Sequence, residues 1–117
     1  MKKLATVIGL IILTASPSYA VEKRCGWVDN PTPGNWFLQD RHSSWIISAQ
    51  LGYQAQGTDK IPDISRRQYV RTNGNYGYAC GCMTVVTDKK NNRILRILSF
   101  TQLPLKQCRN DRALPPR

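Results

Sequence analysis

Residues 78–87 have the sequence YACGCMTVVT, which predicts a β-strand that carries two cysteines. Its second half is the run Thr84-Val85-Val86-Thr87, a β-branched composition that is enriched in strands. The polar segment 88–92 predicts a turn, and residues 93–100 predict a returning strand. Part of that segment, Ile94–Leu98, also suits a helix, but its short length and its position after a strand and a turn favour a hairpin.

The two cysteines of this strand have two distant candidate partners. A bridge between Cys80 and Cys82 would close a very small, strained ring, because a single glycine separates them. We therefore expect one of them to pair with Cys25 and the other with Cys108, with both assignments open. Each such bridge is worth roughly 2–4 kcal/mol, a large share of the stability of a small domain.

Alternating apolar residues predict a second hairpin upstream. From Trp45 to Ala55 every other residue is apolar, and only Ile46 breaks the alternation. This period predicts a half-buried strand, bent at Gly52. Residues 36–39 are expected to pair with it across a turn at 40–44.

The remaining segments predict loops and one short helical turn. Prolines, glycines and asparagines predict a loop at 26–35, and an Asn-Gly pair predicts another at 71–77. Residues 62–67 are expected to form one helical turn capped by Asp63, and residues 109–117 a loose tail. The fold class is therefore mostly β: a small antiparallel domain of hairpins over residues 21–117, held by two disulfides.

The first twenty residues predict a secretory signal peptide. Lys2 and Lys3 precede an apolar run, Leu4–Leu13, and a small-residue site ends at Ala20. The run of about ten residues is too short for a membrane anchor, which needs roughly 20. We expect cleavage after Ala20 and a periplasmic or secreted protein, in which an even number of cysteines favours disulfides over a redox pair or a zinc site.

Several motifs together resemble one bacterial family. They are Cys25-Gly26-Trp27, the segment 30–35, Tyr76-Gly77-Tyr78 followed by Cys80-Gly81-Cys82, and Pro104-Leu105 leading to Cys108-Arg109. This combination is similar to the small exported proteins grouped as domain of unknown function 4087 (DUF4087). The resemblance implies an exported, disulfide-bonded bacterial protein and transfers no catalytic or binding residue.

Catalytic chemistry is disfavoured. Asp40, His42, Ser43 and Ser44 supply the residue types of a hydrolase triad, but triad members come from separate parts of a fold, so a polar turn is expected here. We assign no catalytic residue, metal or cofactor. The enzyme alternative is a small periplasmic hydrolase in which Asp29 or Asp40 faces a second acid across a cleft. A structural envelope protein without a discrete site is a further alternative.

The charge balance points instead to binding. The 117 residues contain 17 Lys and Arg against 7 Asp and Glu, and removal of residues 1–20 takes away two lysines and no acid, which leaves +8. Such a field attracts anionic partners, here an acidic protein or an envelope component, while nucleic acid is disfavoured because no binding-module signature appears. We expect an exported, non-enzymatic binding module, of which an inhibitor or immunity protein is one kind. Its candidate surface is Trp27, Tyr76, Arg66, Arg67, Arg71, Lys89 and Lys90.

Overall fold

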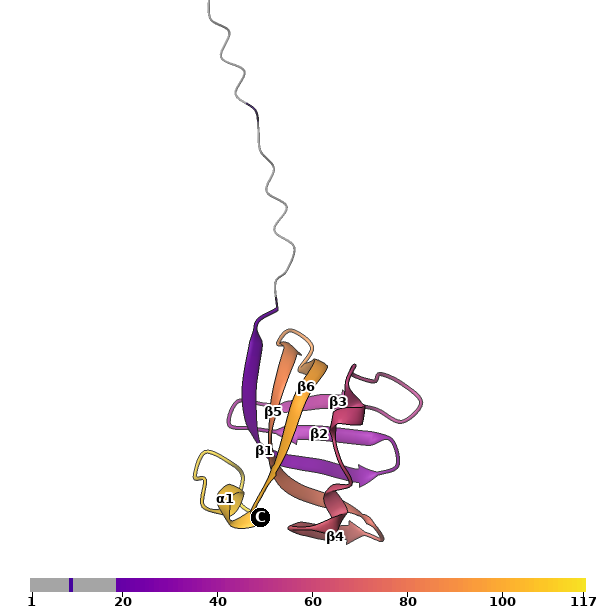
Figure 1. The fold of residues 1–117 in the computed structure, drawn as a ribbon, viewed down its shortest axis with the longest axis vertical. Coiled ribbons are helices and arrows are strands. Elements are labelled where there is room, and N and C mark those ends of the chain that lie inside the picture. Colours follow the sequence, from indigo (N-terminus) through magenta and orange to yellow (C-terminus); the bar gives the residue numbers. More distant parts are fainter. Residues whose placement is uncertain (1–8, 10–18) are drawn as a thin grey trace, which may run out of the picture.

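The computed structural model describes residue 9 and residues 19–117, so the predicted signal peptide lies almost entirely outside the described residues. The chain that follows is mostly β-structure with one short α-helix (Figure 1). The elements in chain order are β1 (Val21–Thr32), β2 (Asn35–Gln39), β3 (Ser44–Ser48), η1 (Thr58–Lys60), η2 (Ile64–Arg66), β4 (Tyr69–Asn73), β5 (Tyr76–Asp88), β6 (Arg93–Leu103) and α1 (Leu105–Arg109).

The strands close into a barrel. The hydrogen-bonded order is β1-β2-β3-β6-β5-β4, and β1 also pairs with β5, which joins five strands in a ring. Every contact is antiparallel except β3 with β6, where Ile46 lies opposite Arg93. This connectivity is that of the five-stranded OB barrel. To it β4 adds a sixth strand beside the first residues of β5.

The barrel interior explains the strand pattern. Side chains that point inward from facing strands form one fully buried cluster, and its members include Val28, Leu38, Ile47, Val85, Ile94 and Ile97. Each inward residue alternates with one that faces outward, as the pleat requires. Burial of these apolar side chains is the main force that holds the barrel closed.

The β2–β3 hairpin is confirmed, but the predicted strand over residues 45–55 is too long. β3 ends at Ser48, and the chain turns at once, with the Gly52 N–H donating to the Ala49 carbonyl and the Ala49 N–H to the Tyr53 carbonyl. Leu51 has a positive φ of 57° and is fully exposed, so the alternation past Ser48 is not that of a strand.

The exception to the alternation, Ile46, has a structural reason. It lies on the outer face of β3, directly opposite Phe37 of β2, and both side chains are partly exposed. Trp45 and Ile47 on either side of it are buried inside the barrel. The apolar residue at a polar position is therefore one half of a cross-strand pair.

The loop predicted at 26–35 is wrong over most of its length, because β1 continues to Thr32. Only Pro33 and Gly34 form the turn to β2. Proline is tolerated because Pro31 lies where the β1–β2 register shifts. Gly26 is required by packing, since a Cβ there would lie 2.0 Å from the Gln39 carbonyl oxygen.

The C-terminal half follows the prediction more closely. β5 and β6 form the expected hairpin, and the alternative helix at Ile94–Leu98 is not formed. The helical turn is the short η2, whose cap Asp63 accepts from the Ser65 N–H. The glycine-rich loop at 71–77 is shorter than expected, because β4 runs to Asn73 and only Gly74, at φ 58°, and Asn75 connect it to β5.

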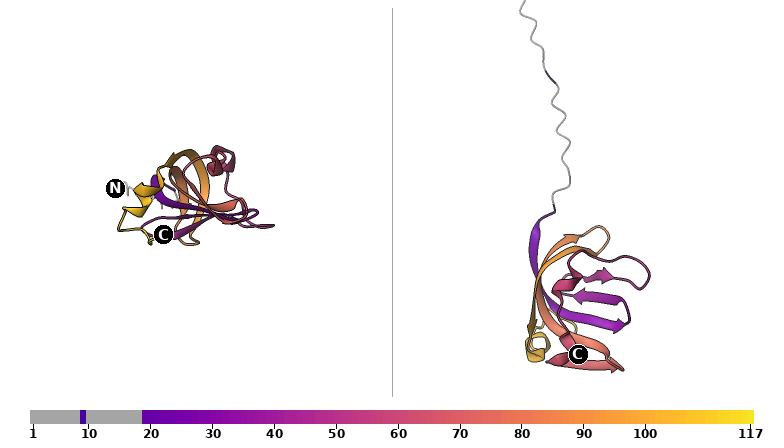
Figure 2. Two further views of the ribbon diagram at one scale, coloured as in Figure 1. Left: turned by 90° about the horizontal axis from the view of Figure 1, so that it is seen from below. Right: turned by 45° about the vertical axis from the view of Figure 1, so that its right-hand side comes forward.

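Both disulfides join distant segments, as expected. Cys25 pairs with Cys82, directly across the β1–β5 ladder, and Cys80 pairs with Cys108 of α1. The helix lies beside the far end of β6 (Figure 1, Figure 2). The fold is thus a mostly β domain with two disulfides and one short helix, as predicted.

The loose tail predicted at 109–117 is wrong. Leu114 is buried in a second cluster with Trp27, Cys80 and Cys108. Arg117 forms an ion pair with Asp29 and a hydrogen bond to Gln39. The residues around Pro115 and Pro116 show no local sign of these contacts, because the partners Asp29 and Gln39 are 88 and 78 residues away along the chain.

Candidate functional site

The predicted basic residues are exposed, but the structure divides them between two ends of the barrel. Lys89 and Lys90 follow the last residue of β5, whereas Arg71 lies opposite Gly77 near its start. A strand rises about 3.3 Å per residue, so the two groups are far apart along β5. Figure 1 shows β4 at the bottom of the barrel and the β5–β6 turn at the top.

The two aromatic residues of the candidate surface differ in exposure. Trp27 is 0% exposed, its Nε1 donates to the Pro115 carbonyl oxygen at 2.9 Å, and its ring meets Tyr78 edge-on. It belongs to the second buried cluster and is withdrawn from the binding surface. Tyr76 at the start of β5 is partly exposed.

Most of the acidic side chains have their charge neutralised by an ion pair with an arginine or a lysine. Glu22, Asp29, Asp40, Asp63 and Asp88 each lie within salt-bridge distance of an Arg or Lys. The exposed cations of residues 19–117 that have no carboxylate at that distance are Lys23, Arg41, Lys60, Arg67, Arg71, Lys90, Arg96, Lys106, Arg109 and Arg112. The solvent-facing charge is therefore strongly positive.

One end of the barrel combines these cations with a hollow. Lys23, Arg41, His42 and Lys89 line a depression of about 550 Å³ between β1, the β2–β3 turn and the β5–β6 turn, and the acids Glu22, Asp40 and Asp111 line it as well. At its base Arg24 is 8% exposed and lies 4.2 Å from the centre of the Trp45 ring. We name Lys23, Arg24, Arg41, His42, Lys89 and the adjoining Lys90 the upper basic surface.

Arg24 organises the acids at this surface. One guanidinium nitrogen donates to Asp40 Oδ2 at 2.7 Å, and another donates to Glu22, which also pairs with Lys89. Burial raises the pKa of Glu22, but the Lys89 ammonium and the Arg24 guanidinium outweigh it, so the pKa lies below its ordinary 4.5. The Glu22 carboxylate is therefore held in its charged form.

The polar turn at 40–44 is likewise structural. Asp40 Oδ1 accepts from the backbone N–H groups of His42 and Ser43, each at 2.9 Å. Burial opposes ionisation of Asp40, but the Arg24 guanidinium and those N–H donors hold its pKa below 3.8. A general acid needs a raised pKa, and Asp29 is occupied by Arg117. These contacts do not favour the hydrolase alternative.

Replacing Asp40 with Asn tests this assignment. The amide keeps an acceptor for the turn and loses the charge that Arg24 requires, so we expect a loss of about 1.5–3 kcal/mol in unfolding free energy at neutral pH. Because the folded-state pKa is lowered, the charge contribution is present above pH 3.8 and is lost as pH falls through the folded pKa. Urea melts of both proteins should therefore converge in acid. A gap that stays constant with pH would contradict the ion pair.

A second hollow differs from the one at the upper basic surface in having no charged lining. It measures about 480 Å³, lies where the β1–β2 turn meets the segment after β3, and contains no charged residue in its lining. Trp36, Gln50 and Gln54 are among its walls. Sequence patterns missed it, because the alternation at 49–55 predicted a strand where the chain instead forms this rim.

No group of three or more His, Cys, Asp or Glu side chains within residues 19–117 is placed to hold a metal ion. No helix among the described residues is long and apolar enough to span a membrane. The two disulfides indicate a protein that folds outside the cytoplasm.

The structure thus defines a small disulfide-bonded β-barrel protein with a cationic surface. The family model described as "Protein of unknown function (DUF4087)" matches residues 19–115, and the chain belongs to this family. Comparison with the curated proteins found no match. Comparison with the solved structures found none either.

Proposed function

We propose that this protein is an exported, non-enzymatic binding protein of the bacterial periplasm or exterior, and that its partner is anionic. The observation that carries the proposal is the pairing of the acids: most are held in ion pairs, while exposed cations remain without carboxylates. A surface of this kind attracts an acidic protein or an anionic envelope component. An inhibitor or immunity protein acts in this way.

Two features favour the upper basic surface over Arg66, Arg67 and Arg71 at the β4 end, where Arg66 and Arg67 also line a hollow, of about 470 Å³. Buried Arg24 of the upper surface leaves Nε without a hydrogen-bond partner among the described residues, and this surface includes the β5–β6 turn. In OB barrels the corresponding turn is one of the ligand-binding loops.

Matched charge reversals test the proposal. Lys23→Glu with Lys90→Glu changes two unpaired cations of the upper surface, and Arg67→Glu with Arg71→Glu changes two at the other end of the barrel. Both pairs alter the net charge equally, and neither breaks an ion pair. With heparin as a polyanionic probe, we expect the first pair to weaken binding about tenfold at low salt. The second pair should have a clearly smaller effect.

The salt dependence completes the test. Binding of the unmodified protein should fall steeply as salt rises, since exposed charges are screened beyond about 10 Å at 0.1 M. Equal losses from both pairs would show that net charge alone matters. Stronger loss from Arg67 and Arg71 would move the site to the β4 end.

A further inference from the structure

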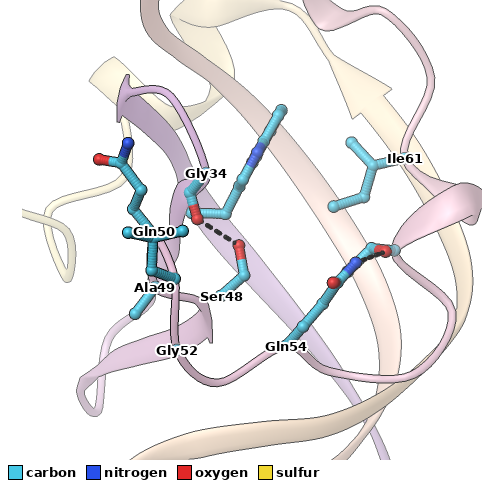
Figure 3. Close-up of a pocket in the computed structure, with 10 residues that line it drawn as sticks. Gly34, Ser48, Ala49, Gln50, Gly52, Gln54 and Ile61 are labelled. Atoms are coloured by element: carbon cyan, nitrogen blue, oxygen red, sulfur yellow. Dashed lines mark hydrogen bonds between the residues drawn. The ribbon is translucent and has the colours of Figure 1, made fainter.

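The uncharged hollow beside Trp36 is walled by residues from two parts of the chain. Figure 3 shows Gly34 and Gln50 on one side of it and Gln54 and Ile61 on the other. The volume of about 480 Å³ lies within the range of small-ligand pockets. The hollow is therefore large enough for a small ligand, and its chemistry decides which.

The walls are already fixed by hydrogen bonds. Ser48 Oγ donates to the Gly34 carbonyl oxygen at 2.8 Å, and the Gln50 N–H donates to Asn35 Oδ1 at 2.9 Å. Gly34 has φ 73°, and a Cβ there would lie 3.2 Å from the Gln50 Cα, so the turn approaches the rim as closely as glycine permits. This preorganisation lowers the ordering cost of binding.

The polar side chains of the hollow that do not fix its walls can bind the hydroxyl groups of a ligand. Gln54 Nε2 donates to Thr58 Oγ1 at 3.0 Å, which leaves the Gln54 carbonyl oxygen as an acceptor and the Thr58 hydroxyl as a donor. The side-chain amide of Gln50 has no hydrogen-bond partner among residues 19–117. A ligand hydroxyl both donates and accepts, so it matches this mixed set.

The apolar wall suits a sugar ring. Trp36 is partly buried against the barrel core, and its remaining surface lines the hollow together with Ile61. An indole offers a flat apolar face beside a polar N–H, which complements the C–H face and the hydroxyl edge of a pyranose. Because no charged residue lines the hollow, phosphate and carboxylate ligands find no counter-ion there.

We propose that this hollow, the Trp36 pocket, binds a neutral sugar unit. The site is separate from the upper basic surface and does not depend on the anionic partner. OB barrels bind oligonucleotides and oligosaccharides, and the β1–β2 turn, which carries Gly34, is one of the loops involved. This likeness of fold is only an analogy, and the absence of charged residues from the lining favours the sugar. The Trp36 pocket is formed by that turn together with the segment that follows β3.

Neutral and charged oligosaccharides test the proposal by NMR. Maltotriose, cellotriose, chitotriose and galactobiose are the neutral probes, and trigalacturonate is the charged one. We expect at least one neutral probe to shift the indole N–H of Trp36 and the side-chain amides of Gln50 and Gln54. The affinity should be the same at low and high salt, because no charge takes part.

Glutamine variants provide the matched control. Gln50→Ala with Gln54→Ala should weaken binding about thirtyfold, since the double variant removes two side chains that hydrogen-bond the sugar. Gln107→Ala changes an exposed glutamine of α1 and should leave affinity unchanged. The proposal is overturned if no neutral probe shifts Trp36, or if only trigalacturonate binds and salt abolishes it.

Discussion

Trp27→Ala should lower the unfolding free energy by about 3–5 kcal/mol, the range for truncating a buried tryptophan. The indole is 0% exposed and packs with Cys80, Cys108 and Leu114. It also binds the chain end, through the hydrogen bond to Pro115 and the Arg117 guanidinium 5.3 Å from its ring centre. A small domain has only about 5–15 kcal/mol in total, so urea melts should show a severe loss.

Two companion variants separate packing from the hydrogen bond. Trp27→Phe keeps most of the apolar volume and loses the N–H, so we expect a smaller cost of about 1–3 kcal/mol. Removal of residues 114–117 should destabilise the protein as well, because it uncovers the same indole. A Trp27→Ala cost below about 1 kcal/mol would fall in the range of surface substitutions. That result would mean that Trp27 is exposed and that residues 114–117 do not pack against it.

The sequence predicts those parts of the fold in which local pattern and tertiary structure agree. The β-branched run before Asp88, the turn after it and the cap at Asp63 depend on neighbouring residues, and each forms as expected. Disulfide pairing was limited to two assignments by the short spacing of Cys80 and Cys82. The choice between them required the β1–β5 register, which places Cys25 opposite Cys82.

The errors occur where distant segments override local signals. Prolines and glycines in 26–35 predict a loop, but β1 has a partner strand on each side and continues through them to Thr32. The alternation after Ser48 predicts a strand, but no neighbouring strand accepts it there beyond single bridges such as Ser48 with Gln54. An alternation of apolar and polar residues indicates a strand only where a neighbouring strand is available to pair with it.

The candidate site was predictable in composition and not in layout. Lys89 and Lys90 are exposed as expected, but the sequence does not show that Lys23 and Arg41, from two other segments, line the same hollow as Lys89. Trp27 lies in a segment rich in turn-forming residues, which suggested exposure. Its burial depends on Leu114 and Pro115, at the other end of the chain.

Loss of the Cys80–Cys108 disulfide should cost more than loss of Cys25–Cys82, although its loop is shorter. The sequence separations are 28 and 57 residues, for which loop-closure entropy alone gives about 3.5 and about 4 kcal/mol. We expect the side-chain packing around each disulfide to reverse the order of these two stability losses. Cys80 and Cys108 are 0% and 3% exposed and pack with Trp27, whereas Cys25 is exposed on β1, which nine other paired positions also hold against β5.

Paired alanine variants measure the difference without leaving an unpaired thiol. For Cys80→Ala with Cys108→Ala we expect a loss of about 5 kcal/mol, since truncation in a packed cluster adds about 1–2 kcal/mol to the entropic cost. For Cys25→Ala with Cys82→Ala we expect about 4 kcal/mol. Urea melts at one pH compare the two, and trypsin under native conditions supplies a second measurement. Cleavage after Arg112 should accelerate only in the first variant, because Cys108 alone ties α1 and the tail covalently to β5. If the losses follow loop length, or if both variants are cut equally, the second cluster does not depend on its disulfide and the tail is held by Trp27 and Asp29 instead.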